Sequence, residues 1–173
     1  MPKGLRSARK EIEALLRAGL TLQACIIAGR LIATNAEDIR LLQLYGLSLA
    51  RLGATQRARE FLEKAYALDS EQGETAGILG RVYKDLYKTS GESEWASLAR
   101  DTYMAGYRAS SEYYPGINAA AMCMVINEPE VGRLIADEII RNLANDPDGY
   151  WELATLGEAY LLTGDFAESR TCY

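Results

Sequence analysis

The residues that could do chemistry are few in this chain of 173 residues, which has three cysteines and no histidine. Without histidine, His-dependent triads, His-ligated zinc and imidazole acid–base chemistry are excluded. Cys25, Cys123 and Cys172 lie far apart with no CxxC pairing, which favours apolar filler over a thiolate metal site. Adjacent carboxylates such as Asp137 and Glu138 point in different directions on one helix and make no acid–base pair. We therefore predict no enzyme activity, no metal site and no cofactor.

Small residues at a fixed spacing indicate how the chain is organised. Gly46 and Gly80 are 34 residues apart, and Ala24 and Ala58 are separated by the same interval. Gly157 begins a similar pattern near the end of the chain. This period is typical of tetratricopeptide repeats, in which helix–turn–helix units bury their apolar faces against their neighbours. We predict an all-α, right-handed tetratricopeptide-repeat solenoid of about five antiparallel helix pairs.

The repeats are expected to form a single domain with turns at small or polar residues. Gly19 and Gly53 would end first helices, and Asn127 would lie at the turn of a weaker unit. The pattern ends at Tyr173, part-way through a second helix, so we expect an N-terminal fragment of a longer protein. The uncovered apolar end would then favour self-association. The predicted repeats span residues 5–36, 38–70, 72–112, 114–146 and 150–173.

An insertion interrupts the period after Tyr83, where the chain has about seven more residues than the repeat requires. The apolar stripe predicts that this helix continues to about Lys88. Gly91 would follow as the break, and Ser93 would cap the next helix. Residues 88–95 either carry a binding function or form a tolerated surface loop.

Charge and hydropathy narrow the classes of partner. The net charge is −5, but residues 1–60 carry ten Lys and Arg against five Asp and Glu, and residues 61–173 carry nine against nineteen. The arginines are scattered and no aromatic set interleaves with them, so we predict no nucleic-acid binding. The apolar stretch of residues 20–33 contains Arg30 and is too short to span a bilayer. We expect no membrane partner and a cytoplasmic location.

The first helix of each pair lines a concave groove in tetratricopeptide arrays, and its inward positions are the candidate binding site. The groove would be basic at first, mixed in the middle and aromatic to polar at the end, which suits a protein or peptide partner with an acidic segment. These side chains could instead be ordinary solvated residues. The lysine and asparagine clamp of chaperone-binding arrays is not recognisable, which disfavours chaperone tails. The candidate residues are Arg40, Gln43, Arg51, Arg81, Lys84, Tyr114, Asn118, Trp151 and Glu158.

Tyr114 precedes Pro115, which predicts an extended backbone at Tyr114. Asn118 would then enter the next helix in its first turn. We prefer a hydrogen bond from Asn118 to the backbone across the inter-repeat turn over a contact with a ligand.

Three segments also carry a family resemblance: GRVYKDLYK (residues 80–88), YYPGINAA (113–120) and YWELATLGEAYLLTGDFAES (150–169). Together they resemble the TRAFs-binding region of stress-activated MAP kinase kinase kinases and its bacterial relatives, over about residues 40–173. That region is a regulatory scaffold, so the resemblance implies interaction with adaptor proteins. We therefore hypothesise a non-catalytic interaction scaffold or regulatory module. The alternative is a ligand-sensing or inhibitory domain that controls an attached effector enzyme.

Overall fold

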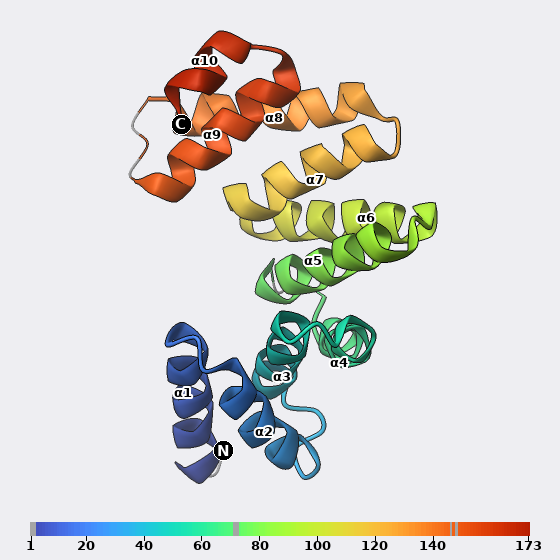
Figure 1. The fold of residues 1–173 in the computed structure, drawn as a ribbon, viewed down its shortest axis with the longest axis vertical. Coiled ribbons are helices and arrows are strands. Elements are labelled where there is room, and N and C mark those ends of the chain that lie inside the picture. Colours follow the sequence, from blue (N-terminus) through green and yellow to red (C-terminus); the bar gives the residue numbers. More distant parts are fainter. Residues whose placement is uncertain (1–2, 71–72, 146, 148) are drawn as a thin grey trace.

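The computed structural model describes residues 3–70, 73–145, 147 and 149–173, and in these residues all regular structure is α-helix. The helices follow one another from the N-terminal end to the C-terminal end of a curved array (Figure 1). The predicted repeat bounds at residues 72 and 146 lie outside the described residues. The described residues form ten helices: α1 (Lys3–Arg17), α2 (Thr21–Ile32), α3 (Ile39–Arg51), α4 (Thr55–Leu68), α5 (Gly73–Ser90), α6 (Ser93–Ser110), α7 (Tyr113–Val125), α8 (Pro129–Leu143), α9 (Tyr150–Thr163) and α10 (Phe166–Thr171).

Each helix pair turns at one residue in the left-handed backbone region. Gly19, Gly53, Gly91 and Gly164 have φ values of 76°, 79°, 74° and 92°, and Asn127 has 62°. Glycine adopts this region without a Cβ penalty, and asparagine tolerates it better than most other residues. The turns predicted at Gly19, Gly53, Gly91 and Asn127 are therefore confirmed.

The predicted glycine positions are points of close helix packing. A Cβ on Gly46 would lie 2.5 Å from Cγ of Leu62, and one on Gly80 would lie 2.8 Å from Cδ1 of Tyr103. The predicted small residues of the second helices are also in the core, since Ala58 is fully buried. Each bulky residue of a second helix thus fills the space that the missing side chain of the first helix leaves.

The insertion lengthens one helix pair instead of forming a long loop. Helices α5 and α6 have 18 residues each, whereas α3 and α7 have 13. The predicted helix extension and the break at Gly91 are confirmed. The predicted cap at Ser93 is wrong: Glu92 occupies the N-cap position and Ser93 is the first helical residue. The Ser90 hydroxyl instead accepts a hydrogen bond from the Glu92 backbone N–H at 3.1 Å.

The prediction for the start of α7 is also wrong. Tyr114 lies inside the helix, and the extended residue is the N-cap Glu112, with φ −72° and ψ 137°. Pro115 falls in the first turn, where its missing N–H removes no helical hydrogen bond. The helix can therefore begin two residues before the proline.

The helices form an inner and an outer layer. Each odd-numbered helix contacts the next odd-numbered one, from α1 to α3, α5, α7 and α9. In the described part of the chain, no two even-numbered helices contact each other. The odd-numbered helices therefore line the concave side, which we call the inner face, and the even-numbered helices form the convex side (Figure 1). This is the arrangement of a tetratricopeptide-repeat solenoid.

Candidate functional site

The N-terminal part of the inner face is an ion-pair network that joins three helices. Arg40 of α3 donates from Nε to Glu13 Oε1 of α1 at 2.8 Å, and its Nη1 lies 2.7 Å from Glu74 Oε1 of α5. Burial opposes the charge on Arg40, but the hydrogen bonds to Glu74 and Glu13 outweigh it and raise the pKa of the guanidinium. The charge that Arg40 could offer to a partner is thus balanced by the protein's own carboxylates.

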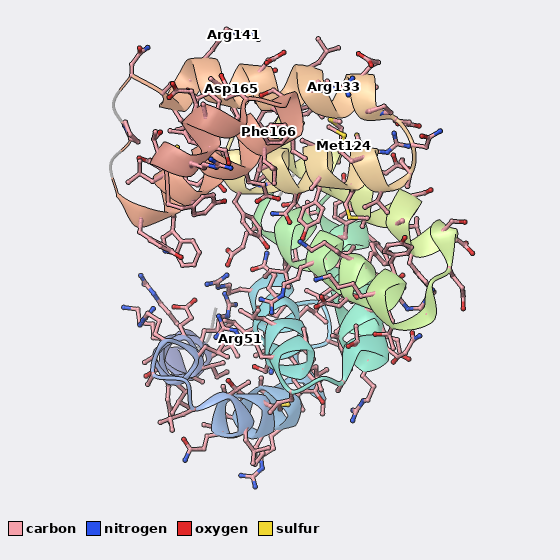
Figure 2. All side chains as sticks on the ribbon, turned by 45° about the horizontal axis from the view of Figure 1, so that its top comes forward. Arg51, Met124, Arg133, Arg141, Asp165 and Phe166 are labelled. Atoms are coloured by element: carbon pink, nitrogen blue, oxygen red, sulfur yellow. The ribbon has the colours of Figure 1, made fainter. Side chains whose placement is uncertain are left out.

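Two more of the candidate residues hold neighbouring repeats together. Gln43 is buried and donates from Nε2 to the hydroxyl of Thr75 at 2.7 Å, so it joins α3 to α5. Arg51 donates from Nη1 to the Leu16 backbone carbonyl at 3.0 Å, yet it stays exposed on the inner side of the array (Figure 2). Gln43 therefore has a structural role, whereas the Arg51 side chain is accessible to a partner.

The middle of the inner face contains a cavity of about 360 Å³ between α3, α5 and α7. Apolar groups of Leu47, Ile78 and Pro115 line it together with the ring of Tyr114. The Tyr114 ring lies over Gly77, where a Cβ would be 3.3 Å from its Cε1, so the glycine makes room for the ring. We call this the central cavity, and the described residues that line it are Leu47, Gly73, Glu74, Gly77, Ile78, Arg81, Glu112, Tyr114 and Pro115.

Arg81 stands at the edge of the central cavity and is weakly paired. Its side chain is 46% exposed, and Nε lies 3.8 Å from Oδ2 of Asp85 on the next turn of α5. Exposed pairs at this separation contribute little to stability. Arg81 is therefore the cation at the cavity edge with the most freedom to change partners.

A polar row crosses α5, α7 and α9 next to this cavity. Lys84 donates from Nζ to Oδ1 of Asn118 at 2.5 Å, and Nδ2 of Asn118 donates to the Tyr114 carbonyl at 2.9 Å. The predicted bond of Asn118 across the inter-repeat turn is thus wrong, because its backbone partner belongs to its own helix. Burial lowers the pKa of Lys84, and burial raises the pKa of Glu158, which Lys84 partly offsets.

Trp151 lies at the start of α9 and is the most exposed of the candidate residues. Its side chain is 73% exposed and packs edge-on against Tyr150, with ring centroids 5.1 Å apart. The Trp151 carbonyl accepts a hydrogen bond from the Thr155 hydroxyl at 2.8 Å. Thr155 is buried and is not available to a partner.

Sequence reasoning missed several residues of the central cavity, and the repeat period could have found two of them. Leu47 lies 34 residues before Arg81, which is one of the predicted groove residues. Glu74 lies 34 residues after Arg40, which places the two in equivalent positions of adjacent repeats. Pro115 carries no such signal, because the insertion shifts the period before α7.

A second hollow lies where the insertion projects beyond the preceding repeat. It has a volume of about 670 Å³ and is bounded by residues 53–57, which form the end of the α3–α4 turn and the start of α4, and by the end of α5. Trp95 forms one wall, stacks on Tyr83 at 5.9 Å between ring centroids and carries the Arg59 guanidinium 5.2 Å from its own centroid. Of residues 88–95, Trp95 packs against its neighbours, whereas residues 88–94 are exposed.

The described residues contain no group of three or more cysteine, aspartate or glutamate side chains arranged to hold a metal ion. No helix within the described ranges is long and apolar enough to cross a bilayer.

Solved structures with the same fold were found at low sequence identity. A thermophilic TPR protein of Thermus thermophilus superposes with a TM-score of 0.77 and 16% identity, over 97% of this chain and 87% of the other. MamA of Desulfovibrio magneticus RS-1 superposes with a TM-score of 0.73 and 18% identity, over 99% of this chain and 92% of the other. At such identities the likeness establishes the fold alone. No curated protein sequence matches the chain.

The sequence itself matches one family model, over residues 7–123. This segment begins in α1, covers the ion-pair network and the central cavity, and ends within α7. It amounts to more than half of the chain. The chain therefore belongs to the TPR-S family, Tetratricopeptide Repeats-Sensor.

Proposed function

We propose that this protein is a non-catalytic interaction module that binds a segment of a partner protein along its inner face. The observation that carries the proposal is the central cavity, whose apolar wall of Leu47, Ile78 and Tyr114 lies beside the exposed Arg81. Peptide sites commonly combine an apolar pocket, which supplies affinity, with a few polar groups that set orientation. Tetratricopeptide arrays offer such a surface through their stacked first helices.

The partner segment carries an apolar side chain that enters the central cavity and at least one acidic side chain. Arg51 and Arg81 are two cations that can meet this acid, because both are exposed. Arg40 contributes less, since Glu13 and Glu74 already pair with it. Fewer positions on the inner face can therefore bind an acidic side chain than in a uniformly basic groove.

We favour a regulatory scaffold in the cytoplasm over an inhibitory or ligand-sensing domain. The resemblance to the TRAFs-binding region supports recruitment of protein partners. The family name contains the word sensor, and a scaffold that reports partner binding to an attached domain satisfies that description.

Reversing the charge of the two exposed arginines should weaken partner binding. Random peptides displayed on phage would be selected on the wild-type chain, and the affinity of a selected peptide would be measured by fluorescence anisotropy. We expect Arg51→Glu with Arg81→Glu to weaken binding by about tenfold per arginine, because each charge-assisted hydrogen bond is lost.

The matched control is Lys64→Glu with Arg108→Glu, which makes the same change in net charge on exposed residues of α4 and α6. This variant should bind as tightly as the wild type, and the helical circular dichroism of both variants should be unchanged. Equal losses in the two variants would contradict an inner-face site.

The C-terminal end is a candidate surface for self-association. Leu161, Phe166 and Tyr173 are exposed, as the sequence predicted, although the Tyr173 ring also lies against Gly157. We expect the apparent mass in light scattering to rise with concentration, because such apolar patches associate. Leu161→Lys with Phe166→Lys should suppress the rise, and Leu22→Lys on α2 should not. A mass that stays monomeric at all concentrations would contradict this expectation.

A further inference from the structure

Lys84 is held in one place on the inner face by its neighbours. Asn118 donates its amide N–H to the Tyr114 carbonyl, which fixes the amide and turns its oxygen towards the Lys84 ammonium. The ammonium also lies 5.8 Å from the ring centroid of Tyr103, a residue with no exposed surface. Asn118 and Tyr103 therefore hold the Lys84 ammonium in place. The site lies beside the central cavity, because Tyr114, whose carbonyl binds Asn118, also lines that cavity.

Within the described part of the chain, the ammonium of Lys84 forms no ion pair. It has three N–H donors, and the acceptor within hydrogen-bond distance is a neutral amide oxygen. No carboxylate of the described residues lies within 4.0 Å of it. Partial burial without a counter-ion is unfavourable for a charged group, in agreement with the lowered pKa of Lys84.

The charged groups that face Lys84 come from two helices. Arg81, Asp85 and Lys88 lie on α5 with Lys84 itself, and Glu158 faces it from α9. Asp85 is the weak partner of Arg81, and Glu158 influences Lys84 across a gap without an ion pair. Three cations therefore stand against two carboxylates.

We propose that Lys84, assisted by Arg81, binds an aspartate or glutamate side chain of the segment whose apolar residue occupies the central cavity. This inference rests on the proposed function and names the chemistry of its partner. Arg81 lines the cavity and precedes Lys84 by three residues, so a segment seated in the cavity passes both cations. Glu158 competes for Lys84 when the site is empty.

The spacing of the two determinants follows from α5. Ile78 lines the cavity and Lys84 follows six residues later, which corresponds to about 9 Å along a helix axis at about 1.5 Å per residue. An extended peptide rises about 3.3 Å per residue. The acidic residue therefore lies about three positions from the apolar anchor.

The test is a selection of random phage-displayed peptides on the full chain. Each peptide is fused to the phage coat protein through its C-terminus, so its carboxylates belong to side chains and none is a free C-terminal group. We expect the wild type to enrich an apolar residue and an acidic residue about three positions apart. Selection on Lys84→Met should keep the apolar residue and lose the acidic one. Lys88→Met, which removes an exposed lysine one turn further along α5, should enrich the same peptides as the wild type.

A double-mutant cycle on one selected peptide locates the contact. Lys84→Met should weaken the affinity for the peptide about tenfold. Replacing the peptide's acidic residue with the corresponding amide should weaken its affinity for the wild type by the same factor. The amide peptide and the acidic peptide should bind Lys84→Met with equal affinity. Glu158→Gln should bind the acidic peptide several-fold more tightly. Thermal unfolding by circular dichroism confirms that each variant is folded.

The outcomes separate the two proposals. Peptides with an apolar anchor and no acidic preference would overturn the role of Lys84 and the acidic character of the partner, and would leave the inner-face binding of a partner segment standing. Enrichment of no peptide would overturn both. An acidic preference that survives in Lys84→Met would also overturn the assignment, because the acid would then bind elsewhere.

Discussion

Truncating Tyr103 to alanine is expected to lower the free energy of unfolding by about 3–5 kcal/mol. Tyr103 has no exposed surface, its ring fills the space at Gly80 and it meets the Tyr114 ring edge-on with centroids 6.2 Å apart. Its removal leaves a cavity where α5, α6 and α7 meet. Urea unfolding followed by circular dichroism measures the change, and hydrogen exchange shows whether it is confined to these helices.

Tyr103→Phe is the matched control, because it keeps the ring and removes only the hydroxyl. That hydroxyl is buried and faces Tyr114 without the geometry of a hydrogen bond. Since no hydrogen bond is lost, we expect stability to change by less than about 1 kcal/mol and in the favourable direction. A loss in Tyr103→Phe as large as in Tyr103→Ala would mean that the hydroxyl, and not the ring, holds the repeats together.

Adding one methyl group at Gly132 is expected to lower the free energy of unfolding by about 1–3 kcal/mol. A Cβ there would lie 2.8 Å from the Ala120 carbonyl oxygen and 3.2 Å from Cβ of Cys123. These atoms belong to the α7 backbone or lie next to it, so no rotamer change relieves the contact, and α7 and α8 must separate. Thermal and urea unfolding of Gly132→Ala measure the loss.

Gly4→Ala provides the comparison, because a Cβ at Gly4 meets nothing within 4 Å. This exposed helical position should be unaffected or stabilised by up to about 1 kcal/mol, since alanine is the better helix former. Equal stability of Gly132→Ala and Gly4→Ala would contradict the close packing of α7 on α8.

The fold was predictable because its signals are local and repeated. A turn at a glycine with a positive φ can be predicted from the neighbouring sequence alone. The period of 34 residues identifies Gly46 and Gly80 as equivalent positions without knowledge of their contacts. The cap at Ser93 and the start of α7 were missed for a different reason. Several residues near a helix end can satisfy the free N–H groups, and packing selects among them.

The candidate site was predictable as a surface but not as a set of interactions. The period places Arg40, Lys84 and Asn118 on the inner helices, where they lie. Whether such a side chain meets solvent or its neighbour depends on distances across repeats, and these follow from packing. Arg40 and Lys84 illustrate the difference, since two carboxylates neutralise the first and an amide holds the second.

The close-packing positions have a consequence for how the array can diversify. Gly46 and Gly80 lie against side chains of the outer layer, Gly132 lies against α7 of the inner layer, and none of the three lines the central cavity. Apart from Gly73 and Gly77, which do both, the glycines at close helix contacts and the residues of the central cavity are thus different residues. Substitutions at Leu47 or Arg81, in evolution or in design, can therefore change what the cavity binds and leave the curvature of the array unchanged.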